Sequence, residues 1–418
     1  MAAVWVRVTA CASSSSSRCL KQRMSSDRSI LVLNSGSSSI KFALYGAKAE
    51  LPRLFAGSLD RIGLSGGRFR AHGLAGESII DVACDLADHA AALDVLMPAI
   101  DQHLAGHPIV AAGHRVVHGG ALYLDHQPVT AEMLSRLSGM AHLAPLHLPG
   151  NVAGMTALQK TRSDITQIAC FDTTFHRSMP HIAQLTGLPR ALFDEGIRRF
   201  GFHGLSYEYV VEALREAGVA VVMERVIIAH LGNGASMCAL KGGRSIETTM
   251  GYSTLPGLLM GTRPGDVDPG VILHLLERKG LTVEQVGTLL YEGSGLLGVS
   301  GLTSDMRVLL SQSQVPAVNE AIDLFCYRAR YHLAALTAVL GGVDRVVFTG
   351  GIGAHAATIR AGICDGLDYL GISLEPAANA ASADVVSQPG SRVIVQAMLS
   401  DEELVAARHV WRWIGSVS

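Results

Sequence analysis

The sequence predicts an α/β fold organised in two domains. The chain has 418 residues, more than a single hydrophobic core normally serves. From Ser29 onwards, short β-rich runs alternate with longer helical patterns, as in α/β proteins. One strand–small loop–strand pattern also occurs once in each half of the chain. Two domains of related topology, facing each other across a cleft, account for all three observations.

The β-rich runs divide into two groups. Strands of a first sheet are predicted at residues 30–34, 40–45, 108–118 and 165–172, and strands of a second group at 225–231, 236–241 and 344–351. A helix is predicted at residues 210–219. Residues 320–340 are predicted to form a long, half-buried helix, because apolar residues recur there at helical spacing. These residues are Ile322, Phe325, Ala329, Leu333 and Leu336.

Loops of small residues end three of the predicted strands. Two belong to the repeated pattern: ILVLN-SGSSS-IKFALY begins at Ile30, and VIIAH-LGNGA-SMCALK begins at Val226. The third, FTGGIGA, ends at Ala354. Such loops can present backbone N–H groups to an anion, although each alone is more often an ordinary turn. The sequence has neither a GxxxxGK(S/T) motif nor a strand-linked GxGxxG, so a bound nucleotide is expected between the two domains.

Composition excludes several classes of function. With 49% apolar and 17% charged residues and a net charge of −2, the chain has no basic footprint for a nucleic-acid partner. The longest apolar runs are shorter than the roughly 20 residues that span a membrane. Seven cysteines without a CxxC pair argue against a disulfide framework and a structural zinc site. This usage favours a reducing compartment, and a cytoplasmic location is expected.

The first 23 residues stand apart in composition. They carry four basic residues, a five-serine tract and no acid, as in an organellar transit peptide. The favoured alternative is that Met24 is the true start, because Arg7 interrupts any clean apolar or amphipathic face. Under either interpretation, residues 1–27 are expected to be a disordered extension outside the fold.

Reactive side chains are clustered among glycines in five stretches. Arginine in a rigid Gly/Pro-rich loop suits bidentate binding of carboxylate or phosphate. A lone histidine beside apolar residues is more often a core residue, and the Asp266/Asp268 pair is more simply explained by turn stabilisation than by metal binding. The stretches are GHRVVHGG (113–120), APLHLPGN (144–151), ACFDTTFHRSMP (169–180), RRFGFHGLS (198–206) and MGTRPGDVDPG (260–270).

Across residues 29–415 the chain resembles the acetate kinase family. The motifs NSGSSSIKF, HRVVHGG, APLH, FDTTFH, FGFHG, AHLGNGAS, MGTRPGDVDP, SDMR, TGGIG and DEEL occur in the family's order. The resemblance implies two actin-like (ASKHA-type, ribonuclease H-like) domains with the active site in the cleft between them. It also implies reversible transfer of the ATP γ-phosphoryl to acetate, Mg²⁺ as cofactor with Mn²⁺ as an alternative, and a homodimer. The expected domains are residues 28–172 with 402–418, and residues 173–401.

Site roles follow from the resemblance position by position. Asp172, His203 and Arg263 match catalytic residues, and Asn34 and Glu402 match residues associated with the metal. The acyl substrate is expected to contact Arg115, Val117, Leu146 and Phe202. The nucleotide is expected to contact Lys41, His230, Leu231, Gly232, Asn233, Gly234, Asp305, Met306, Arg307, Gly351, Ile352, Gly353, Ala354 and His355.

Three positions depart from the family pattern. Ala354-His355 stands where Glu-Asn is usual, which puts side-chain contacts to the nucleotide in question. Asp401 stands where Asn is usual and adds charge beside Glu402. Thr254 stands where a proline often lines the acyl pocket, so it bears on which acid fits.

The chemistry of the implied reaction sets what the site must supply. A carboxylate nucleophile is already ionised at pH 7, so no general base is needed and Asp172 is expected to organise the metal shell or fix an arginine. Cations are needed instead, because the two reacting groups repel each other. A sugar kinase is disfavoured because a hydroxyl nucleophile needs a base. Kinases for propionate or butyrate, and a non-catalytic nucleotide-binding homologue, stay open as alternatives.

Overall fold

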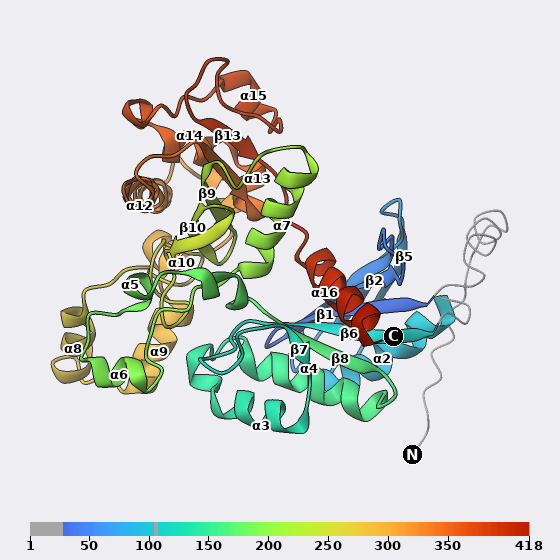
Figure 1. Ribbon diagram of the computed structural model, residues 1–418. Helices are drawn as coiled ribbons and strands as arrows, with labels where there is room; N and C mark the ends of the chain where they lie inside the picture. Colours follow the sequence, from blue (N-terminus) through green and yellow to red (C-terminus); the bar gives the residue numbers. More distant parts are fainter. Residues whose placement is uncertain (1–27, 104–107, 418) are drawn as a thin grey trace.

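The computed structural model describes residues 28–103 and 108–417. The N-terminal extension predicted for residues 1–27 lies outside this range. Two β-sheets form two lobes (Figure 1), and the chain passes from the first lobe to the second and returns at its C-terminal helix. This arrangement agrees with the predicted α/β class.

The first sheet has eight strands in the order β5-β4-β3-β2-β1-β6-β8-β7. Strand β1 pairs antiparallel with β2 and parallel with β6, which in turn is parallel to β8. The strands are β1 (Ser29–Ser35), β2 (Ser39–Gly46), β3 (Arg53–Asp60), β4 (Arg68–His72), β5 (Ser78–Ala83), β6 (Ile109–Val116), β7 (Gln127–Pro128) and β8 (Thr166–Phe171). All four strands predicted for this sheet are confirmed.

The second sheet repeats the central topology of the first. Its order is β11-β10-β9-β12-β13, with β9 antiparallel to β10 and parallel to β12. The strands are β9 (Arg225–Leu231), β10 (Ala235–Lys241), β11 (Arg244–Thr248), β12 (Arg345–Thr349) and β13 (Ile394–Ala397). The repeated sequence pattern therefore forms the same antiparallel hairpin, β1–β2 and β9–β10, at equivalent places in two sheets.

Helices cover both faces of each sheet, which explains why the central strands are apolar throughout. The helices are α2 (His89–His103), α3 (Ala131–Gly139), α4 (Leu148–Thr161), α5 (His181–Gln184), α6 (Arg190–Asp194), α7 (Gly204–Glu216), α8 (Pro269–Glu277), α9 (Val283–Glu292), α10 (Gly295–Ser300), α11 (Met306–Ser311), α12 (Pro316–Leu340), α13 (Gly350–His355), α14 (Ala357–Cys364), α15 (Pro376–Ala380) and α16 (Glu402–Val417). Short 3₁₀ turns lie at Ala141–Leu143, Thr174–Ser178 and Asp368–Leu370.

Successive side chains along β1 and β9 pack against helices on opposite faces of the two sheets. In β1, Leu31 and Leu33 pack in a cluster with α2 and α4, whereas Ile30 and Val32 pack with Val405 and Val410 of α16. In β9, Ile227 and Ala229 share a cluster with α12, and their neighbours on the strand share one with α7. The period of two in a strand thus buries most residues of both strands, and Asn34 and His230, near the strand ends, are partly exposed.

The long helix predicted at 320–340 is α12, which begins four residues earlier at Pro316. All five residues that predicted its apolar face are buried in the cluster shared with β9. Within residues 28–103 and 108–417, no helix is both long and apolar enough to cross a membrane. The cysteines of these residues are free: Cys84, Cys170, Cys238, Cys326 and Cys364.

Close packing of α4 on the SGSSS loop gives a testable constraint. A Cβ added at Gly150 would lie 2.2 Å from the carbonyl oxygen of Gly36, a backbone atom that cannot move alone. We predict that Gly150→Ala lowers the free energy of unfolding by about 1–3 kcal/mol through overpacking. Gly139→Ala, at a helical glycine with no atom within 4 Å of the added Cβ, is the control and should change it by less than about 0.5 kcal/mol. Chemical denaturation measures both, and equal effects would contradict the packing.

Candidate active site

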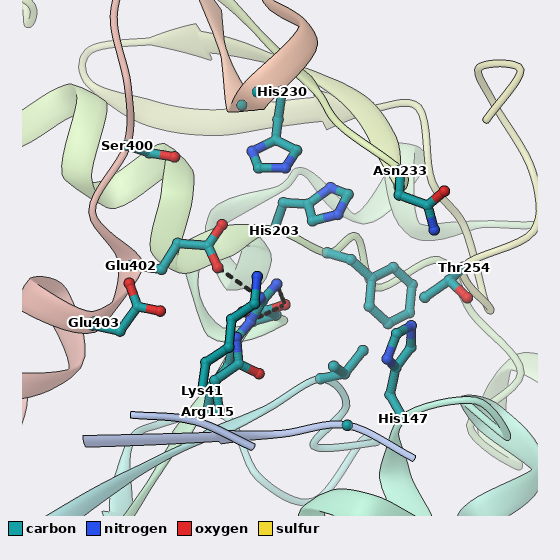
Figure 2. Close-up of a pocket in the computed structure, with 18 of the residues that line it drawn as sticks. Lys41, Arg115, His147, His203, His230, Asn233, Thr254, Ser400, Glu402 and Glu403 are labelled. Atoms are coloured by element: carbon teal, nitrogen blue, oxygen red, sulfur yellow. Dashed lines mark hydrogen bonds and ion pairs between the residues drawn. The ribbon is translucent and has the colours of Figure 1, made fainter. Parts of the chain in front are cut away.

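A cavity of about 470 Å³ lies between the two lobes, at the ends of the central strands. Residues from both sheets and from the start of α16 line it (Figure 2). Most of the predicted site residues meet here. They are Asn34, Lys41, Arg115, Val117, Asp172, Phe202, His203, His230, Asn233, Gly234, Arg263, Gly351 and Glu402. We call this cavity the cleft.

A second cavity, of about 590 Å³, adjoins the cleft. Asn233 and Gly351 line both, so the two cavities are direct neighbours. The second cavity collects most of the remaining residues predicted to contact nucleotide: Gly232, Asp305, Met306, Arg307, Ile352 and His355. The loop before α11 and the helix α13 therefore face each other across one space.

Four predicted residues line neither cavity. Leu231, Gly353 and Ala354 are buried, and Leu146 is half-buried. Leu231 packs in the apolar cluster of the second sheet, because its side chain alternates with that of His230 along β9. A motif places a segment at a site, but strand and helix geometry decide which of its side chains point there.

Nine cleft-lining residues were absent from the predicted site. They are Gly36, Ser39, His147, Asn151, Thr254, Gly350, Leu399, Ser400 and Glu403. Asn151 shows what was missed: its amide nitrogen donates to the carbonyl of Ser35 (2.6 Å), and its oxygen accepts from the N–H of Val117 (3.0 Å). The sequence signal that could have identified Asn151 was its place in the APLHLPGN stretch, which also contains His147.

Arg115 is held by carboxylates on two sides. It ends β6, and its Nη2 and Nε lie 2.8 and 3.1 Å from the carboxylate of Asp172, at the end of the neighbouring strand β8. Its Nη1 lies 2.6 Å from Glu402 of α16 (Figure 2). Burial lowers the pKa of Arg115, but the two acids outweigh burial and raise it. Burial raises the pKa of Asp172, and the guanidinium opposes that shift.

The electrostatic environment of Arg263 is the opposite of that of Arg115. It is 5% exposed and donates from Nη1 to the carbonyl of Thr254 (2.9 Å). No carboxylate of the described residues forms an ion pair with it, and burial lowers its pKa to about 10. A buried cation without a counter-ion is costly unless an anion joins it. The cleft therefore offers an anion site at Arg263.

His203 and Arg263 converge on one point. A Cβ at Gly234 would lie 2.7 Å from Nη2 of Arg263 and 3.2 Å from Nε2 of His203. Glycine is needed there so that both donors can approach the same ligand. His203 itself has a left-handed backbone (φ 58°), and its ring stacks on His230 with centroids 4.2 Å apart.

A chain of hydroxyl groups fixes the proton on His203. The hydroxyl of Ser236 lies 2.7 Å from Nδ1 of His203 and 2.5 Å from the hydroxyl of Tyr207. Burial raises the pKa of Tyr207, and Ser236 is the one hydrogen-bond partner of its hydroxyl among the described residues, so we assign Tyr207 as the donor to Ser236. Ser236 then donates to Nδ1, which leaves the Nε2–H of His203 for the cleft. Burial, followed by the neighbouring cations, holds the pKa of His203 well below its usual value.

The other cleft histidines are also neutral. Burial lowers the pKa values of His230 and His147 to about 4. The cleft thus has two sides. On one side Arg115 is paired with carboxylates, and on the other Arg263 and neutral hydrogen-bond donors can bind an anion.

Two of the three departures from the family pattern are compensated locally. Asp401 forms an ion pair with Arg53 (2.5 Å) and accepts from the N–H of Leu404 (2.9 Å) at the start of α16. Ala354 is buried and does not line the second cavity, and its carbonyl accepts from Arg360 (2.8 Å). His355 does line that cavity, and Thr254 lines the cleft.

These features define a class of protein: a two-lobed α/β fold with a buried arginine, unpaired among the described residues, in the cleft between the lobes and a second cavity of about 590 Å³ beside it. Residues 29–408 match the model of the Acetokinase family. The chain belongs to that family.

Individual relatives agree over nearly the whole chain. An acetate kinase of Rhodopseudomonas palustris (strain TIE-1) is 49% identical over 389 residues, 92% of this chain and 98% of that one. The crystal structure of Porphyromonas gingivalis acetate kinase superposes with a TM-score of 0.83 at 34% identity, covering 93% and 100% of the two chains. A propionate kinase from Francisella tularensis gives a TM-score of 0.85 at 33% identity, covering 91% and 98%. The predicted fold class and family are confirmed.

The proton chain at His203 predicts a fixed tautomer. Nitrogen-15 NMR of the imidazole should show His203 as the neutral Nε2–H form at pH 7, and because its pKa is depressed it should remain neutral down to pH 6. In Ser236→Ala, which removes the donor to Nδ1, both tautomers should appear. Protonation of His203 near pH 6.5, or a dominant Nδ1–H form in the unaltered protein, would contradict this assignment.

Proposed function

We propose that this chain catalyses the reversible transfer of the ATP γ-phosphoryl to acetate, giving acetyl phosphate and ADP. The observation that carries the proposal is the unpaired, buried Arg263 beside the Nε2–H of His203, in a cleft that opens into a nucleotide-sized cavity. Membership of the acetokinase family and 49% identity to an acetate kinase support the same reaction.

The chemistry requires charge neutralisation rather than proton transfer. Acetate is ionised at neutral pH, so its carboxylate can attack phosphorus directly. Two unit charges 4 Å apart repel each other by about 4 kcal/mol at an effective dielectric of 20. Arg263 offsets this repulsion and donates to the transferring group, and neutral His203 adds a hydrogen bond without needing to lose a proton. Correct positioning of the two reacting groups supplies the remainder of the rate enhancement.

The acidic side of the cleft fits a magnesium ion. Carboxylate and amide oxygens are the ligands that Mg²⁺ prefers, and Asn34, Glu402 and Glu403 supply such groups. The group formed by Arg115, Asp172 and Glu402 carries two formal negative charges against one positive, so a cation is favoured there. When bound there, the ion would offset the negative charge of the phosphates.

Arg115 and Glu402 are expected to change partners during binding. With every nitrogen of Arg115 already facing a carboxylate, an acyl substrate must compete with Glu402 for Nη1. If Glu402 turns to the metal, Nη1 becomes free for the substrate while Asp172 keeps the guanidinium oriented. This supports the hypothesis that Asp172 fixes an arginine rather than moving a proton.

The identity of the acid depends on a small apolar wall. Val117, Phe202 and Thr254 line the cleft, and one methylene in such a pocket is worth only about 1–3 kcal/mol of discrimination. Propionate is therefore the second candidate, favoured by Thr254 in place of a proline and by the structural likeness to a propionate kinase. A non-catalytic homologue is disfavoured, because Arg263, His203 and Asp172 are all assembled in one cleft.

We also propose the domain limits and a homodimer. α16 packs on β1 and β6, which supports grouping residues 402–418 with 28–172, apart from 173–401. A dimer is supported by the outer surface of the second lobe, where α8 has no buried residue and Val271, Leu273, Tyr327 and Tyr331 are each about half exposed. The cytoplasmic location stays a prediction.

Acyl phosphate formation tests the proposed function. With ATP and Mg²⁺, the protein should convert acetate with a higher kcat/KM than propionate or butyrate, and omission of Mg²⁺ should abolish turnover. Trapping of the acyl phosphate as a hydroxamate measures the product. A preference for propionate would change the substrate and keep the mechanism. Nucleotide binding without turnover of any acid would contradict the proposal.

A further inference from the structure

His176 is a buried histidine whose two ring nitrogens are both engaged outside the cleft. It lies in the 3₁₀ turn Thr174–Ser178, four residues after Asp172, and is 1% exposed. Its Nε2 is 2.9 Å from the carbonyl oxygen of Phe202, and its Nδ1 is 2.9 Å from the hydroxyl of Ser245 on β11. It does not line the cleft.

The partners of His176 fix its tautomer. A carbonyl oxygen only accepts, so Nε2 must carry the proton and donate to Phe202. Nδ1 must then accept from the hydroxyl of Ser245, which in turn can accept from the thiol of Cys238 (3.2 Å). Burial lowers the pKa of His176 to about 4, so the ring is neutral and this pattern holds at neutral pH.

The carbonyl of Phe202 lies in the turn that places two residues, Phe202 and His203, in the cleft. Gly201 has a φ of 80°, and a Cβ there would lie 2.6 Å from Cγ of His176, so the turn lies directly on the imidazole. The next two residues are Phe202 and His203, and His203 is held in a left-handed conformation that is strained for a non-glycine residue. The turn closes where the N–H of Gly204 donates to the carbonyl of Asp172 (3.0 Å).

We propose that His176 is a positioning residue: its Nε2–H holds the carbonyl of Phe202 and thereby keeps the strained turn that aims the Nε2–H of His203 at the transferring phosphoryl group. The peptide joining Phe202 to His203 cannot rotate while its carbonyl is bound, so the orientation of the His203 backbone is set from the side opposite the cleft. This inference rests on the proposed phosphotransferase function and adds a residue that touches no substrate.

A double-mutant cycle tests whether His176 affects catalysis through His203. His176→Phe keeps a buried ring and removes both hydrogen bonds, and it should lower kcat for acyl phosphate formation about tenfold while leaving the KM for ATP unchanged. His203→Ala removes a transition-state donor and should lower kcat about 10²–10³-fold. In the His203→Ala background, His176→Phe should lower kcat by less than about twofold, since its effect passes through the residue already removed.

Two further variants separate positioning from general packing. His176→Gln can still donate to the carbonyl of Phe202 and should keep kcat within about threefold of the unaltered protein. Cys238→Ala changes the same buried cluster and removes only the 4.0 Å contact of the Cys238 sulfur with Nδ1, while the bonds of His176 to Phe202 and Ser245 stay in place; its kcat should be unchanged. If His176→Phe does not fold, Ser245→Ala, which removes the donor to Nδ1 and so loosens the imidazole ring, takes its place in the cycle with an expected loss of about threefold.

The outcomes are decisive in both directions. Equal loss of kcat from His176→Phe with and without His203, or no loss at all, would overturn the proposal. Loss of kcat in Cys238→Ala as large as in His176→Phe would reduce His176 to a packing residue and would overturn it too. An absence of acyl phosphate from the unaltered protein would instead be a failure of the proposed function, because that measurement does not depend on His176.

Discussion

The contrast between paired and unpaired charge in the cleft is the constraint on which the rest of the site depends. Arg115 joins the ends of β6 and β8 to the start of α16 through Asp172 and Glu402. Removing one partner of such a buried pair costs about 3–5 kcal/mol, so this contact also helps to hold the returning helix on the first lobe. Arg263 has no such partner among the described residues, and its charge is available to a ligand.

Each lobe contributes what the other lacks. The first lobe supplies the acidic side of the cleft, and the second supplies Arg263, His203 and the glycine loops that line the second cavity. Neutral histidines let the cleft hold several donors without adding charges that would repel Arg263. Closure of the lobes would remove water from this space and strengthen each of these interactions.

The sequence predicts the fold well because local signals agree with it. Apolar runs gave β1, β2, β9 and β12, and the repeated strand–loop–strand pattern anticipated two sheets of equivalent topology. Long-range pairing was not predictable in this way: the contacts of Arg115 with Glu402 and of Asp401 with Arg53 join residues far apart in the chain. The direction in which each side chain points was also not predictable from the sequence. Leu231 and Ala354 were therefore expected to contact nucleotide although they are buried, and His176 was noted without a role.

The direct test of this account is acetate binding to the metal-free, nucleotide-free protein, measured by calorimetry in the unaltered chain, in Arg263→Met and in Arg115→Met. If unpaired charge anchors the anion, Arg263→Met should abolish binding, whereas Arg115→Met, whose guanidinium is already neutralised by two acids, should weaken it by less than about threefold. Loss of binding in Arg115→Met with binding retained in Arg263→Met would show that Arg115 anchors the anion even while it is paired with Glu402, and would contradict the account.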